Sequence, residues 1–123
     1  TNESAFRVPE EVTGLDLCFL LSLNEEGFQR RFKGSAVRRA TRIGLQRNAC
    51  VVLGNLGDTT AAPALIQALK HDASLVRGHA AWALGRLGGR HLLGPLKEAS
   101  ILEMDPDAKT EMEEAWEVIN KGL

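Results

Sequence analysis

This 123-residue chain contains an internal repeat, which limits the folds open to it more than any other pattern in the sequence. The segment NACVVLGNLGD, residues 48–58, returns as HAAWALGRLGG at residues 79–89, an offset of 31 residues. A period of this length is typical of solenoids, in which each unit buries its apolar side against the next one. Abundant Ala and Leu at helical spacing, with few aromatic residues, favour helices over strands. The sequence therefore predicts an all-α fold, a short α-solenoid of helical hairpins with a helical lead-in.

The repeat also indicates where helices begin and where they approach one another. We expect Asp72 or Ser74 to cap the helix that follows them, because their side-chain oxygens accept hydrogen bonds from free backbone amides. Gly54 and Gly85 recur at the same position inside the two repeated helices, where a glycine costs about 1 kcal/mol. We expect close helix approach there. A third, divergent unit begins at residues 105–106 and carries an acidic face, as a solvated cap of the stack would.

Positive charge is concentrated in one part of a chain whose net charge is −1. Residues 29–48 hold seven cationic side chains and no acid, whereas residues 101–123 are rich in acids. Arg30 can pair with Glu26 one turn back, but no acid lies three or four places from Arg38, Arg39 or Arg42, so we expect no intrahelical neutralisation of these three.

An unneutralised cationic cluster favours a partner that carries phosphates, RNA or DNA. Two other interpretations stay open: an acidic protein surface, and a solvated helix face whose carboxylate partners come from elsewhere. The predicted phosphate contacts are Arg30, Arg31, Lys33, Arg38, Arg39, Arg42 and Arg47, with secondary contributions from Arg77, Arg86 and Arg90.

The chain offers little for catalysis, metal binding or membrane insertion. Its three histidines are not paired with a cysteine or a recognisable carboxylate, so we predict no catalytic residue. Cys18 and Cys50 lie in apolar helical patterns and are interpreted as core residues, so we expect no metal and no cofactor in this chain. The longest apolar stretch, residues 15–23, is too short to span a bilayer. We expect a cytoplasmic protein without a membrane partner.

Two stretches carry a resemblance to known families. LVRGHAAWALGRLGG, residues 75–89, resembles the short HEAT-like repeat of the phycobilisome-lyase type. Residues 16–58 resemble the region that follows the iron–sulfur domain in epoxyqueuosine reductases. The matching elements are Phe28, Phe32, Gly34-Ser35, Arg38-Arg39, Arg47-Asn48 and Leu53-Gly54-Asn55. The Val-Arg pair usual at the start of the repeat helix is present as residues 76–77, but the first unit has Leu45-Gln46 there.

The resemblance implies a function for the chain as part of a longer protein. Family members use cobalamin and two four-iron four-sulfur clusters to reduce epoxyqueuosine on the wobble base of a tRNA. These cofactors and the oxidoreductase activity are expected in the parent protein, and this non-catalytic portion is expected to grip the phosphates of the tRNA anticodon stem-loop. The alternative is a scaffold that docks an acidic partner or its own catalytic domain. Whether Arg47, Asn48 and Asn55 face RNA or that domain stays open.

Three segments follow from this interpretation. Residues 1–13 are expected to be a linker from a missing N-terminal catalytic domain. Residues 14–44 form the helical lead-in with the basic segment, and residues 45–123 form the HEAT-like repeats with the acidic C-terminal capping helix.

Overall fold

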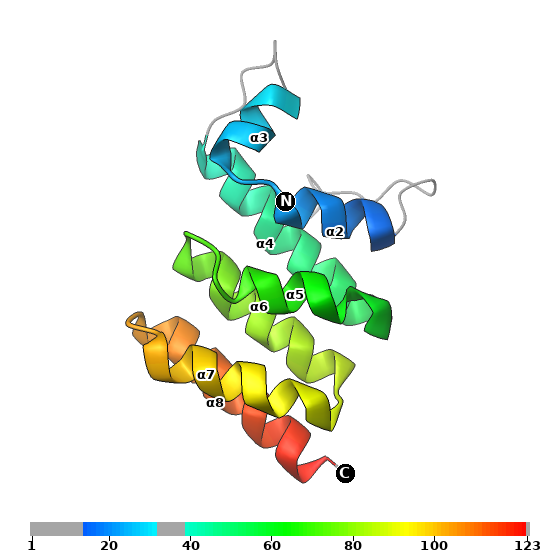
Figure 1. The fold of residues 1–123 in the computed structure, drawn as a ribbon, viewed down its shortest axis with the longest axis vertical. Helices are drawn as coiled ribbons and strands as arrows, with labels where there is room; N and C mark the ends of the chain where they lie inside the picture. The colour runs from blue at the N-terminus through cyan, green and yellow to red at the C-terminus, as the bar shows by residue number, and fades with distance from the viewer. Residues whose placement is uncertain (1–13, 32–38, 123) are drawn as a thin grey trace, which may run out of the picture.

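The computed structural model describes residues 14–31 and 39–122. These segments form helices joined by short turns and contain no strand, which confirms the all-α prediction (Figure 1). The helices are α2 (Gly14–Ser22), α3 (Glu25–Arg31), α4 (Arg39–Leu56), α5 (Ala62–Ala68), α6 (Ser74–Leu87), α7 (Leu93–Leu102) and α8 (Pro106–Lys121), with 3-10 turns η1 (Thr59–Ala61) and η2 (Arg90–Leu92).

The helices stack as a two-layered solenoid. In Figure 1, α4, α6 and α8 lie side by side and run in the same direction, while α5 and α7 return across them in the second layer. Helix α2 packs against α4 and α5 at the first end of the stack. The space between the layers is filled by fully buried side chains from successive units: Leu53, Leu65, Leu84, Leu92, Leu96 and Met112.

The recurring glycines lie at the contacts between helices of the first layer, as predicted. A Cβ atom added to Gly54 would lie 3.1 Å from the Cα atom of Ala83 on α6. A Cβ atom on Gly85 would lie 3.1 Å from the Cβ atom of Ala115 on α8. Contacts this short leave no room for a side chain, so the glycines set the spacing of the three stacked helices.

Three of the helix starts in the described residues carry a side-chain cap, those of α3, η1 and α8. Asn24 accepts a hydrogen bond from the Gly27 amide at 2.7 Å, and Asp58 and Asp105 cap η1 and α8 in the same way. The prediction for α6 is wrong. Ala73 occupies its N-cap position without a side-chain hydrogen bond, because Asp72 is turned toward another partner.

The structure can be compared with two of the predicted segments, the lead-in and the repeats. Helix α4 runs without interruption across the boundary between residues 44 and 45. Phe28 is fully buried and anchors α3, whereas Phe32 and the segment 1–13 lie outside the described residues.

Cys18 and Cys50 are free thiols, and burial raises the pKa of Cys50 to about 12, as expected of an unreactive core thiol.

Candidate nucleic-acid interface

The exposed part of the predicted cationic surface lies at the end of α3. Arg30 and Arg31 occupy the last turn of this helix, where cations also interact favourably with the helix dipole. Arg30 pairs with Glu26 at 3.4 Å, with both side chains more than 70% exposed. The Arg31 guanidinium lies 5.8 Å from the centre of the Phe19 ring. Exposed pairs of this kind contribute little to stability, so both guanidinium groups remain available to a ligand.

Arg42 belongs to the interior and not to this surface. Its side chain is 1% exposed and is the largest fully buried side chain in the described residues. Its Nε atom donates to Glu25 at 2.9 Å, and its Nη2 atom donates to both carboxylate oxygens of Asp72, at 3.1 and 2.8 Å. The prediction that Arg42 contacts phosphate is therefore wrong for this structure.

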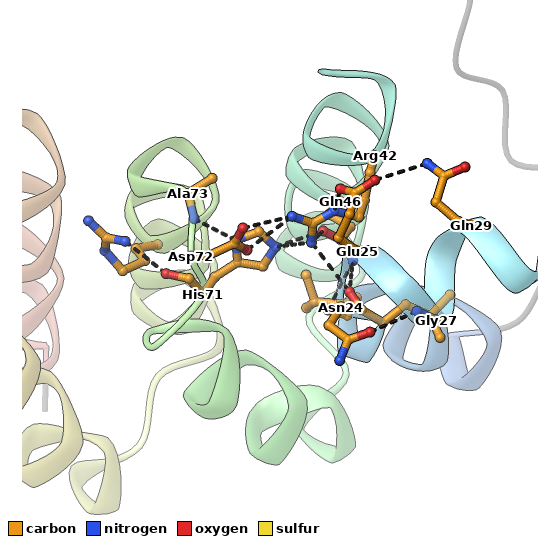
Figure 2. A network of polar contacts seen from close by, with 12 residues as sticks. Asn24, Glu25, Gly27, Gln29, Arg42, Gln46, His71, Asp72 and Ala73 are labelled. Carbon is orange, nitrogen blue, oxygen red and sulfur yellow. Dashed lines mark hydrogen bonds and ion pairs between the residues drawn. The ribbon is translucent and has the colours of Figure 1, made fainter. Parts of the chain in front are cut away.

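The expectation failed because these partners come from outside the helix that carries Arg42. Figure 2 shows carboxylates from α3 and from the turn after α5 converging on one guanidinium group. Helical spacing identifies partners three or four residues away, whereas Glu25 and Asp72 lie 17 and 30 residues from Arg42. The third interpretation was a solvated helix face with carboxylate partners from elsewhere. Arg42 has such partners, but its side chain is buried and not solvated.

Two polar side chains complete this buried network. Gln46, fully buried, accepts from Arg42 Nη1 at 3.0 Å and donates to the carbonyl oxygens of Leu20 and Leu23 at 2.9 and 2.8 Å. These bonds satisfy the carbonyl end of α2. The network therefore joins α2, α3, α4 and the turn after α5, and it fixes the lead-in helices to the first repeat.

The hydrogen bonds assign one tautomer to His71. The Ala73 amide donates to His71 Nδ1 at 2.9 Å, so Nδ1 is unprotonated. The proton is then on Nε2, which donates to Gln46 Oε1 at 2.6 Å. Because this form of the ring is neutral, His71 Nδ1 and Asp72 Oδ1, 3.1 Å apart, do not form an ion pair. Arg42 Nη1 lies 3.2 Å from His71 Nε2, but both atoms carry hydrogens, so this contact is not a hydrogen bond.

A related arrangement occurs one repeat later, and we call each arginine with its bound carboxylate a clamp. Arg77 Nε and Nη2 donate to the two oxygens of Glu103 at 2.7 and 2.8 Å, and its Nη1 donates to the His71 carbonyl oxygen at 2.7 Å. Hydrogen bonding to Arg77 holds the pKa of Glu103 below its ordinary value, and the same bond raises the pKa of Arg77. Arg77 is therefore also engaged inside the protein.

The repeat offset relates the two clamps. Asp72 precedes Glu103, and Gln46 precedes Arg77, by the 31 residues that separate the repeated segments. Glutamine occupies the position of the repeat arginine in the first unit, and Arg42, one turn earlier, supplies the missing guanidinium. The sequence signal that identifies this network is the offset between the two carboxylates.

The Arg77–Glu103 clamp makes stability depend on pH. A carboxyl group with a lowered folded pKa stabilises the protein above the ordinary glutamate pKa of about 4.3, and this stability is lost as the pH falls through the lowered pKa. We expect Glu103→Gln to reduce the urea midpoint at neutral pH and to have little effect in acid. Glu98→Gln, an exposed control on α7, should change neither midpoint. Equal losses by Glu103→Gln at both pH values would contradict the assignment.

The remaining predicted contacts are dispersed. Arg47 is half-buried and donates to Asn48 Oδ1 at 2.7 Å, while Asn55 is exposed at the far end of α4. The Arg86 guanidinium lies 5.7 Å from the Trp82 ring, and Arg90 is exposed in η2. Lys33, Arg38 and the side chain of Arg39 lie outside the described residues.

Within residues 14–31 and 39–122, no three His, Cys, Asp or Glu side chains are grouped so that they could hold a metal ion. None of the helices described in those ranges combines the length and the apolar character needed to cross a bilayer.

Stacked helical hairpins with tight glycine contacts define the protein class. Residues 34–116 match the family model of HEAT repeats, and the chain belongs to that family. The resemblance to epoxyqueuosine reductases is also confirmed. The epoxyqueuosine reductase of Bacillus subtilis is 31% identical over 101 residues, which cover 81% of this chain and 26% of that protein.

Two further comparisons extend this result. An uncharacterized protein of Geobacillus stearothermophilus is 34% identical over 81% of this chain and 47% of its own length. A crystal structure of epoxyqueuosine reductase with an epoxyqueuosine-modified tRNA-Tyr stem loop superposes with a TM-score of 0.74 and 30% identity, over 85% of this chain and 28% of that one. The chain thus spans between a quarter and a half of the length of these proteins.

Proposed function

We propose that this domain binds the phosphate backbone of a tRNA stem loop through the end of α3. The observation that carries the proposal is the pair of exposed guanidinium groups of Arg30 and Arg31 on a helix that the buried Arg42 network holds in place. The structural relative that was solved with a tRNA stem loop supports this partner. Phosphate contacts position a nucleic acid without reading its sequence, which suits a domain that presents a modified base to another site.

Arg42 has an indirect part in this proposal. Its bond to Glu25 fixes the first turn of α3, so the positions of Arg30 and Arg31 at the other end depend on it. A surface whose cations are held before the ligand arrives loses less side-chain and loop entropy on binding. Lys33, Arg38 and Arg39 follow Arg31 in the sequence, and we include them as contacts.

The reaction itself is proposed for a longer protein. By its resemblance, that protein reduces epoxyqueuosine to queuosine with cobalamin and four-iron four-sulfur clusters. The two cysteines of this chain are fewer than the four thiolates that such a cluster needs, so we assign the cofactors to the catalytic domain. The contribution of this chain is to hold the substrate and to dock beside that domain.

The number of phosphate contacts can be tested with a salt series. We expect Arg30→Ala/Arg31→Ala to weaken binding of a tRNA anticodon stem-loop and to reduce the slope of log K against log salt by about 1.4 to 1.8. Each side chain that neutralises a phosphate contributes to this slope because it releases a counterion. Fluorescence anisotropy with a labelled stem-loop measures both quantities.

The control removes the same charge from the other end of the stack. Lys97 and Lys121 are exposed on α7 and α8, so Lys97→Ala/Lys121→Ala alters net charge equally. This variant should keep the wild-type slope. If both double variants weaken binding alike, the protein attracts RNA by its overall charge and α3 is not the interface.

A further inference from the structure

A groove on the outer face of the first layer has no part in the proposed RNA interface. It consists of two hollows, each of about 260 Å³, on either side of Trp82. The first hollow includes Val51 of α4, and the second includes Val118 of α8. Trp82 and Glu111 line both hollows, so we describe the two together as one groove, with lining residues from α4, α6 and α8.

Helix α6 supplies the centre of this groove. Gly78 and Gly85 lie one turn before and one turn after Trp82 on the same helix face, and each lines one of the hollows. Because neither has a side chain, α8 packs closely against both positions: an added Cβ atom would lie 3.4 Å from the Ala108 Cα atom at Gly78 and 3.1 Å from the Ala115 Cβ atom at Gly85. The Trp82 ring reaches across to Gly54 of α4, where a Cβ atom would meet its Cζ3 atom at 2.8 Å. A half-buried Trp with small residues around it is typical of an anchor position in a protein interface.

The charges around the groove indicate the chemistry of its occupant. Glu111 lines both hollows and Glu114 lines the second, and no lysine or arginine in the described segments forms an ion pair with either carboxylate. Arg86 on the same helix also lines the second hollow, and its guanidinium lies 5.7 Å from the centre of the Trp82 ring. The groove therefore has an aromatic and aliphatic floor, and the two carboxylates at its edge outnumber the one guanidinium. This combination attracts a cation with an apolar stem and repels phosphate.

We propose that this groove docks an extended protein segment in which an arginine or lysine stands next to an aliphatic residue. The aliphatic side chain lies against Val51, Gly78 and Trp82, and the neighbouring cation reaches Glu111 and Glu114. The RNA surface and this groove are then separate, with the cationic end of α3 for phosphate and the acidic side of α8 for protein. The proposal does not depend on RNA binding, because it uses none of the same side chains.

The probe for this proposal is a pair of short synthetic peptides, acetyl-Leu-Arg-Leu-Arg-amide and acetyl-Leu-Glu-Leu-Glu-amide. We expect the cationic peptide to shift the Trp82 indole signal and the Gly78 and Gly85 amide signals in an NMR titration of the whole chain. The acidic peptide should leave these signals unchanged. Trp116→Phe identifies the Trp82 signal, since the chain has two tryptophans.

Matched charge removals on α8 locate the site. Glu111→Gln/Glu114→Gln should weaken binding of the cationic peptide about fivefold or more, the loss expected when close charge pairs are removed. Asp107→Asn/Glu113→Gln removes two charges from the same helix outside both hollows and should change the affinity less than twofold.

Three results would overturn the proposal. The first is that the cationic peptide shifts none of the Trp82, Gly78 and Gly85 signals. The second is that the two double variants weaken peptide binding equally. The third is that the tRNA stem-loop shifts the same signals, which would assign the groove to RNA. The RNA experiment on α3 can fail without affecting this outcome, because it reports on a different surface.

Discussion

Replacing Arg42 with alanine is expected to destabilise the domain by about 3 kcal/mol, the lower end of the range for breaking a buried ion pair. The variant leaves the Gln46 side-chain oxygen and the Leu23 carbonyl oxygen without the donor that Arg42 supplies. The estimate is at the lower end because the Glu25 and Asp72 side chains are 36% and 50% exposed and can recover water. Urea unfolding followed by circular dichroism measures the change.

Two further variants separate the causes of this loss. Arg42→Met retains much of the volume without the charge, and Arg42→Lys retains the charge without the planar group that reaches both carboxylates. We expect neither to recover more than half of the lost stability. Arg90→Ala, an exposed control, should change stability by less than about 0.5 kcal/mol. An equally small effect of Arg42→Ala would show that the network does not hold the lead-in to the repeats.

Two glycines of the same helix should respond to alanine with opposite signs. A Cβ atom at Gly54 would lie 2.8 Å from the Trp82 ring and 3.1 Å from the Ala83 backbone, so Gly54→Ala must push α4 and α6 apart. Overpacking of this kind costs about 1–3 kcal/mol, which exceeds the gain in helix propensity. Gly44 has nothing within 4 Å of an added Cβ atom, so Gly44→Ala should stabilise the domain by about 0.5–1 kcal/mol.

The same unfolding experiment tests this pair. Gly54→Val should destabilise more than Gly54→Ala, because its two methyl groups enter the contact with α6. If Gly54→Ala stabilises the domain as Gly44→Ala does, the close approach of α4 and α6 does not require a glycine, and helix propensity alone decides the effect.

The fold was predictable because its determinants are local or periodic. The 31-residue offset identifies equivalent positions, and the glycines at 54 and 85 lie where that equivalence places close contacts. Caps such as Asp58 and Asp105 act within three residues of their own position, so sequence spacing is sufficient to recognise them.

The candidate site was predictable only in part, because most charged side chains in this solenoid pair with residues from other helices and turns. Arg30 pairs with Glu26 inside one helix, as its spacing indicated. Arg42 and Arg77 bind carboxylates 30 and 26 residues away, and no helical periodicity relates these positions. Asp72 was expected to cap α6 and instead neutralises Arg42, so one residue accounts for two of the wrong predictions.

The most direct test of RNA binding through α3 maps the contact on the protein. In an NMR titration of the chain with a tRNA anticodon stem-loop, we expect shifts of the amide signals of Glu25–Arg31 and of the first turn of α4. The signals of α7 and α8 should stay in place. Shifts confined to α6 and α8, or no shifts at low salt, would contradict the claim that the end of α3 holds the RNA.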